Sequence, residues 1–242
     1  MRHAVIVAHG QPSDPGPAAR ALADLGARVA AHLPGWTLTT ATLAEPGALA
    51  AATTAPSGRA FPLFLAGGWF TRTHLPARLA EAGAKGWQVL EPFGCDPALH
   101  ALAVETLREA IAARGWQAAR TRLLLAAHGS FKSPVPAAIA GLVAARCAAD
   151  LGLQGAAAAF IDQTPQLADA TGYGPQSLCL PFFAAEGGHV TDDIPAALTA
   201  AGFKGDLLPP LGLAPGVPAL IAAAIRAGKP VCAAACRHSP AP

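Results

Sequence analysis

Two side chains that can bind a metal ion or move a proton, Glu186 and His189, lie close together in the sequence. They follow an apolar stretch, Leu180–Ala184, that is typical of a buried strand, and two glycines separate them. The residues Thr191–Asp193 then indicate the start of a helix. Ligands of parallel α/β sheets bind at the carboxyl ends of strands, so this loop is a candidate metal-binding or acid–base site.

The surrounding pattern occurs twice along the chain. An apolar strand ends in the tripeptide AHG in each half, and an offset of 119 residues relates His9 in the first copy to His128 in the second. The same offset relates many prolines and glycines at turns, including Pro15 and Pro134, Pro17 and Pro136, Pro46 and Pro165, Pro62 and Pro181, Gly68 and Gly187, and Gly83 and Gly202. A constant offset between turn residues predicts a tandem duplication of a β-α-β-α unit.

Strand-like and helix-like segments alternate in both halves. This alternation predicts an α/β protein with two similar doubly wound parallel-sheet domains that face one another across a cleft. We expect an N-terminal repeat over residues 1–118, a C-terminal repeat over 119–229 and a tail over 230–242. In this fold, His9, His128 and the loop with Glu186 and His189 would all line the cleft.

The composition excludes several classes of protein. The chain has 242 residues, of which 52% are hydrophobic and 13% are charged, so it is globular rather than disordered. The net charge is +2, and the absence of any run of like charges argues against nucleic acid or a membrane surface as partner. The N-terminal apolar run is too short for a signal peptide, and four prolines interrupt the uncharged stretch near the C-terminus. We expect a cytoplasmic protein.

The five cysteines are scattered, as is typical of reduced thiols rather than a disulfide framework. Near the C-terminus, Cys232, Cys236 and His238 form a C-x3-C-x-H pattern that lacks the usual C-x2-C spacing of metal sites. Whether this tail binds anything stays open.

The two halves differ in the residues that could do chemistry. At the constant offset, Glu186 corresponds to Gly67, His189 to Phe70, and Asp193 to His74. One half has therefore kept a carboxylate and an imidazole that the other lacks. This difference predicts a single asymmetric site made of His128, Glu186 and His189, with His9 as a further cleft residue.

The two motifs resemble those of a known family. The AHG motif after the first strand, together with the motif PFFAAEGGHVTDDIP over residues 181–195, is similar to the sirohydrochlorin chelatases of the ATP-independent tetrapyrrole chelatase superfamily. The resemblance covers essentially the whole chain, as two copies. It implies that His128 and His189 bind the metal, that Glu186 is their acidic partner, and that His9 is a degenerate twin of His128. The chain departs from the family pattern at Phe70, where a first-half site would need a histidine.

The resemblance implies an enzyme that inserts Co²⁺ or Fe²⁺ into sirohydrochlorin, in cobalamin or sirohaem biosynthesis. The metal would be a substrate, and no nucleotide would take part, since the sequence has no G-x-G-x-x-G or P-loop motif. Lys132 and Arg72 would contact carboxylates of the tetrapyrrole. The residue types suit this chemistry, because imidazoles hold such ions exchangeably and a carboxylate accepts protons.

Two other functions remain open at this point. The Phe70 departure keeps a non-catalytic tetrapyrrole- or metal-binding protein with the same fold in consideration. A hydrolase that uses Ser130 beside His128 is disfavoured, because the chain has no G-x-S-x-G motif. The metal, the pathway, the participation of His9, and the choice between monomer and homodimer are not determined by the residues.

Overall fold

The computed structural model describes residues 1–233 and 236–239. Within them, the chain forms two four-stranded parallel sheets, with strand orders β2-β1-β3-β4 and β6-β5-β7-β8. The strands of the first sheet are β1 (Arg2–Ala8), β2 (Trp36–Thr42), β3 (Gly58–Pro62) and β4 (Trp87–Val89). Those of the second sheet are β5 (Arg122–Ala127), β6 (Gly155–Phe160), β7 (Ser177–Pro181) and β8 (Asp206–Leu207). Both are doubly wound sheets of an α/β fold, as the sequence predicts.

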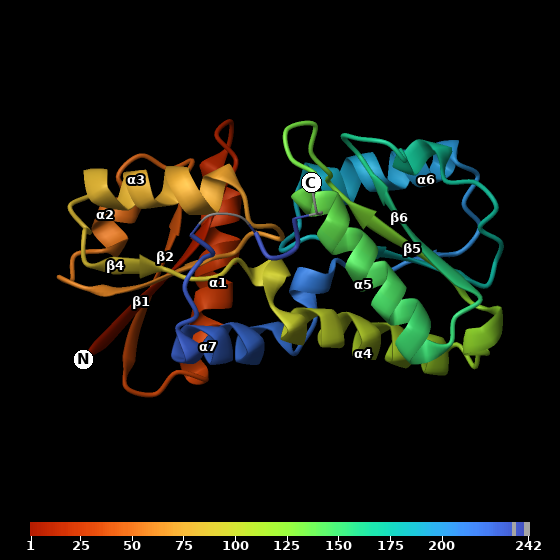
Figure 1. The fold of residues 1–242 in the computed structure, drawn as a ribbon, viewed down its shortest axis with the longest axis horizontal. Helices are drawn as coiled ribbons and strands as arrows, with labels where there is room; N and C mark the ends of the chain where they lie inside the picture. The colour runs from red at the N-terminus through yellow and green to blue at the C-terminus, as the bar shows by residue number, and fades with distance from the viewer. Residues whose placement is uncertain (234–235, 240–242) are drawn as a thin grey trace. The chain divides into compact units, whose positions relative to one another are not determined.

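Helices cover both faces of each sheet (Figure 1). Around the first sheet, α1 and α7 pack against each other on one face, and α2 and α3 lie on the other. Around the second sheet, α4 and α5 pack together on one face, and α6 lies on the other. The helices are α1 (Pro15–Ala31), α2 (Ala48–Ala52), α3 (Leu75–Glu81), α4 (Pro97–Ala113), α5 (Val135–Leu151), α6 (Ile194–Ala200) and α7 (Val217–Ala227). None of the described helices is long and apolar enough to cross a membrane.

The compact units of the structure do not follow the predicted repeat boundaries. Unit 1 consists of residues 1–96 and 215–237, and unit 2 consists of residues 97–214 and 238–242. The difference arises because the last helix of each repeat changes sheets: α4 packs on α5 of unit 2, whereas α7 packs on α1 of unit 1. Of the predicted tail, residues 234–235 and 240–242 lie outside the described residues.

The structure reproduces the constant offset in its secondary structure. Offsets of 119 relate β3 to β7, α3 to α6, and the π-helical turn Phe70–His74 to the turn His189–Asp193. One predicted boundary is wrong: the strand expected at 180–184 is β7, which ends at Pro181. Its partner β5 ends at Ala127, so the ladder closes with the bond from the Phe182 N–H to the Ala126 carbonyl, 2.7 Å long.

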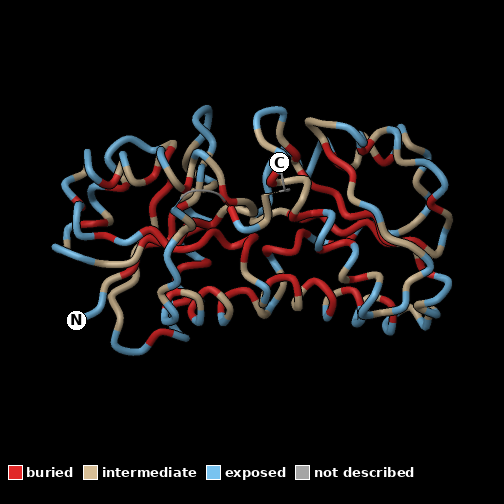
Figure 2. Tube along the Cα trace, viewed as in Figure 1, coloured by how far each residue is buried: buried red, intermediate tan, exposed pale blue. Residues whose placement is uncertain are grey.

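The cores of the two units lie along their strands (Figure 2). In unit 2, Leu124, Cys179 and Ile194 are completely buried in one cluster that joins the sheet to α6. Burial raises the pKa of the Cys179 thiol to about 12, so this thiol is a neutral core group at physiological pH. All five cysteines are free, as predicted.

A buried glycine beside the loop after β7 supplies a test of this packing. A Cβ on Gly212 would lie 2.0 Å from the Ala184 carbonyl oxygen, which is backbone and cannot move aside cheaply. We expect Gly212→Ala to lower the free energy of unfolding by about 1–3 kcal/mol or more. Gly141, in α5, has open space around its Cα, so Gly141→Ala should raise stability by about 0.5–1 kcal/mol. Urea denaturation followed by circular dichroism measures both, and equal midpoints would contradict the packing.

Candidate functional site

His128 is held at the carboxyl end of β5 by the tight turn that follows it. Gly129 has a φ of +80°, and a Cβ there would lie 2.7 Å from the Gln163 side chain, so only glycine fits. The loop after β6 clamps the same turn: the Asp162 N–H donates to the His128 carbonyl at 2.9 Å, and the Ser130 N–H donates to Gln163 Oε1 at 2.6 Å. The glycine of the AHG motif is therefore required by backbone geometry.

His189 begins a π-helical turn that leads into α6. The turn spans His189–Asp193, and the Ile194 N–H closes it by donating to the His189 carbonyl. Val190 and Ile194 point into the core of unit 2, so His189 and Asp193 are left on the exposed side. Pro195 follows at once and has no N–H to continue a regular ladder. Single π turns of this kind are frequent at functional sites.

The two imidazoles predicted to share a site lie next to each other. The ring centroids of His128 and His189 are 4.6 Å apart, and the rings meet edge to face at 82°. Phe183 lies beside them, with its ring centroid 6.4 Å from that of His189. The side chains remain accessible, with 44% of His128 and 49% of His189 exposed. Unit 2 therefore presents two adjacent, solvent-accessible imidazoles.

Acceptor groups surround the Nδ1 atom of each histidine. The His128 Nδ1 is 3.1 Å from the Gly129 carbonyl and 3.4 Å from Asp162 Oδ2, and the His189 Nδ1 is 2.6 Å from Asp193 Oδ2. Carbonyl and carboxylate oxygens only accept, so they assign the proton of each neutral ring to Nδ1. The Nε2 lone pairs are then left to bind a metal ion or accept a proton.

Asp162 and Asp193 are site residues that the sequence reasoning missed. Asp162 follows β6, so its position after the carboxyl end of a neighbouring strand could have identified it as a site residue. Asp193 lies four residues after His189, a spacing that brings two side chains to one side of a helical turn. Both are carboxylates that orient imidazoles, the arrangement common around metal-binding histidines.

The role predicted for Glu186 as a ligand stays a prediction. Glu186 is exposed in the loop before His189, and no hydrogen bond or ion pair joins it to either imidazole within the described chain. Among the described residues, no group of three or more His, Cys, Asp and Glu side chains is arranged to hold a metal ion. Unit 2 thus presents two imidazoles with carboxylates around them, not a closed ligand cage.

Unit 1 builds the same turns with different side chains. His9 follows β1 and is exposed, and its ring lies 5.0 Å from Phe70, the residue in the position of His189. His74, in the position of Asp193, stacks on Trp69 at 4.8 Å. Phe70 stands in place of the second imidazole, His189, and His74 stands in place of the carboxylate of Asp193. The two halves therefore differ in the side chains at these positions. Among its described residues, unit 1 has no counterpart of the His128–His189 pair.

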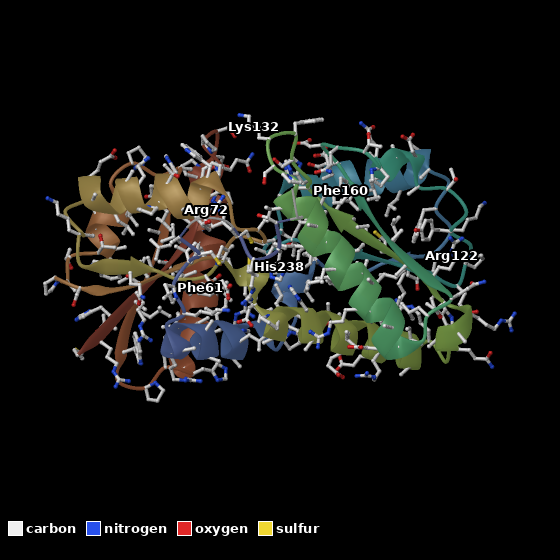
Figure 3. All side chains as sticks on the ribbon, in the orientation of Figure 1. Phe61, Arg72, Arg122, Lys132, Phe160 and His238 are labelled. Atoms are coloured by element: carbon white, nitrogen blue, oxygen red, sulfur yellow. The ribbon has the colours of Figure 1, made fainter. Side chains whose placement is uncertain are left out.

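The remaining predicted residues lie on the loops that follow the strands (Figure 3). Lys132 is exposed on the loop between β5 and α5, and its backbone N–H donates to Ser130 Oγ at 3.1 Å. Arg72 lies in the π-helical turn of unit 1. Contact of either cation with a substrate stays a prediction.

Comparison with known proteins agrees with this architecture. A family model described as CbiX matches residues 122–227. A solved structure of CbiX, the terminal enzyme for biosynthesis of sirohaem in denitrifying bacteria, is 49% identical, with a TM-score of 0.88 over 93% of this chain and 99% of that chain. This chain belongs to the CbiX family. The predicted family resemblance is confirmed, whereas no curated protein sequence matches.

More distant structures share the fold of this CbiX-family chain. SirB from Bacillus subtilis with Fe³⁺ is 16% identical, with a TM-score of 0.70 over 93% of this chain and 95% of that one. The sirohydrochlorin chelatase SirB from Bacillus subtilis subspecies spizizenii, in complex with cobalt, is 17% identical, with a TM-score of 0.66 over 93% and 94%. At these identities the likeness concerns the fold.

The exposure of the two imidazoles predicts that they contribute little to stability. We expect His128→Ala and His189→Ala each to change the free energy of unfolding by no more than about 0.5 kcal/mol, because exposed side chains are lost at small cost. By contrast, Leu124→Ala removes a completely buried side chain and should cost about 2–5 kcal/mol. Urea denaturation of the three variants makes the comparison. A large loss in the histidine variants would assign the pair a structural role instead.

Proposed function

We propose that this chain inserts a divalent metal ion, Fe²⁺ or Co²⁺, into sirohydrochlorin without ATP. The observation that carries the proposal is the edge-to-face pair of His128 and His189, each with its Nδ1 directed to an acceptor. Neutral imidazole nitrogen is a good ligand for both ions and does not select sharply between Fe²⁺ and Co²⁺. The metal is a substrate in this reaction.

An open pair of ligands suits transfer better than storage. Two imidazoles leave most coordination positions of the ion free for water and then for the pyrrole nitrogens of the macrocycle. A closed set of strong ligands would retain the ion, as structural metal sites do. The nearby carboxylates of Asp162 and Asp193 favour the approach of a cation and orient the two rings.

Insertion also requires the loss of two protons from pyrrole nitrogens. We assign Glu186 as the proton acceptor, since it lies in the loop that carries His189 and is exposed to solvent. A carboxylate in water can take a proton from the macrocycle and pass it to solvent. Among the described residues, no hydrogen bond or ion pair holds Glu186 back from this role.

The relatives support the substrate and leave the metal open. The 49% identical CbiX is described as the terminal enzyme of sirohaem biosynthesis, which favours Fe²⁺ and sirohaem for this chain. The structure of SirB with cobalt belongs to a sirohydrochlorin chelatase and keeps Co²⁺ and cobalamin as the alternative. We place the reaction in the cytoplasm, where the five free thiols of the chain would persist.

The first test measures metal insertion by the histidine variants. Anaerobic mixing of sirohydrochlorin with Fe²⁺ or Co²⁺ is followed by absorbance, with the spontaneous rate subtracted. We expect His128→Ala and His189→Ala each to lower kcat/KM by at least about 100-fold, since each removes a group that acts on the ion. His9→Ala is the matched control, because His9 has the same place in the AHG motif as His128 but faces Phe70. It should retain activity within a few-fold.

Each contrary result has a defined meaning. Full activity of both unit 2 variants with loss in His9→Ala would move the site to unit 1. Tight binding of sirohydrochlorin or metal by the wild type, with no metallated product above background, would identify a non-catalytic binding protein.

The assignment of Glu186 has its own matched pair. Glu186→Gln should lower the insertion rate by at least about ten-fold, because the amide cannot accept the proton. Asp192→Asn removes an exposed carboxylate from the adjacent turn and should leave the rate nearly unchanged. Equal effects of the two substitutions would show that only the summed negative charge matters.

A further inference from the structure

Residues 229–231, which follow α7, run along the edge of the first sheet. After α7, the Glu91 N–H donates to the Lys229 carbonyl at 2.8 Å, and the Val231 N–H donates to the Val89 carbonyl at 3.1 Å. Leu90 and Pro230 form an antiparallel bridge between these two bonds. We call residues 229–233 and 236–237 the C-terminal strap. The strap covers β4, the edge strand of the sheet.

A buried carboxylate fastens both ends of the strap. Glu91 is 9% exposed, and its Oε2 lies 3.1 Å from Lys229 Nζ and 3.1 Å from Arg237 Nη2. Arg237 also donates to the carbonyl of Cys95. The strap is thus seated by backbone bonds at its start and by ion pairs at its start and its end.

Two buried thiols meet where the strap ends. Cys95 Sγ and Cys236 Sγ are 3.7 Å apart, and the residues are 1% and 5% exposed. Both line a small cavity with Glu91 and with Cys232, which is half-buried. Other cysteines do not meet in this way within the described chain: Cys147 and Cys179 are buried in unit 2 with no thiol beside them.

The position of this thiol pair in the chain gives it a structural consequence. Unit 1 is built from two segments, residues 1–96 and 215–237, with all of unit 2's residues 97–214 between them. Cys95 lies at the end of the first segment and Cys236 at the end of the second. The two segments are connected along the chain only through unit 2. A covalent bond between Cys95 and Cys236 would link them directly.

We propose that Cys95 and Cys236 are a thiol–disulfide pair that closes to lock the strap onto unit 1 under oxidising conditions. The oxidant is a low-molecular-weight disulfide such as oxidised glutathione. One cysteine thiolate attacks a sulfur of glutathione disulfide, forming a mixed disulfide and releasing one glutathione thiolate. The second cysteine thiolate attacks the protein sulfur of the mixed disulfide and releases the other. The cysteines lose two electrons and two protons, and two molecules of glutathione are formed.

The surroundings determine how readily this exchange proceeds. Burial, together with the neighbouring Cys236, raises the pKa of the Cys95 thiol well above its usual range. Only the thiolate attacks a disulfide, so exchange at neutral pH is slow and accelerates as the pH rises. In a reducing cytoplasm both cysteines stay as thiols, and a higher ratio of oxidised to reduced glutathione converts them to the disulfide.

The test is a redox titration of the full chain in glutathione buffers of increasing oxidised fraction. After equilibration, free thiols are alkylated in denaturant and counted by mass spectrometry. We expect three alkylated thiols out of five in the oxidised wild type, and a linked peptide pair that contains Cys95 and Cys236. Cys95→Ser and Cys236→Ser should each abolish the linked pair, whereas Cys232→Ser and Cys147→Ser should retain it.

Thermal unfolding supplies the second readout. The cross-link would join residues 141 positions apart, and closing so long a loop restricts the unfolded chain. The Tm of the oxidised wild type should rise by at least about 5 °C, and a reductant should reverse the rise. Cys236→Ser should show no such shift, even if Cys95→Ser fails to fold. Five thiols at every glutathione ratio, or a linked pair of Cys232 and Cys236, would overturn the proposal.

Discussion

The candidate site depends on the parallel pairing of β5 with β7. This ladder aligns Leu124 with Cys179 and Ala126 with Pro181, so the two strands end at the same edge of the sheet. His128 follows the first strand directly, and the loop and π-helical turn after the second return His189 to it. The sheet order adds β6 on the other side of β5, which brings Asp162 to the same edge. A slip of this register by one residue would separate these side chains and turn each core side chain of the strand to the opposite face of the sheet.

The two units show how one backbone can carry unlike chemistry. Both have a glycine with positive φ after the first strand and a π-helical turn after the third, at the same offset in sequence. In unit 2 the turn carries His189 and Asp193, and in unit 1 it carries Phe70 and His74. The backbone therefore sets the distance between two ring positions, about 5 Å in both units. The side chains decide whether the second position holds an imidazole or an apolar ring.

The exchange of terminal helices gives unit 1 its unusual construction. Because α7 packs on α1 and α4 packs on α5, unit 1 needs residues 215–237 from the C-terminal part of the chain to be complete. The C-terminal strap then adds a backbone pairing at the edge of β4 and buries Glu91 between two cations. The sequence indicates only a tail here and does not reveal these contacts, since they are made with residues more than a hundred positions earlier.

Much of this arrangement follows from local sequence. Apolar runs such as Leu123–Ala127 are buried on both faces of a parallel sheet and identify the strands, and the repeated prolines and glycines identify the turns between them. The AHG motif correctly predicts His128 at a strand end, and the constant offset relates Phe70 to His189. The strands, turns and motifs depend on neighbours in the sequence, and the offset depends only on comparing the two halves of the sequence.

The rest was decided by tertiary structure. Asp162 joins His128 through the order of strands in the sheet, and Asp193 joins His189 through a π turn that interrupts the expected helix start. Glu186, which its spacing and the family resemblance assign to the imidazoles, is exposed and has no hydrogen bond or ion pair to them among the described residues. The partners of α4 and α7, and the meeting of Cys95 with Cys236, depend on packing between distant segments. Such contacts form only when the whole chain buries its apolar faces together, and no window of sequence contains that information.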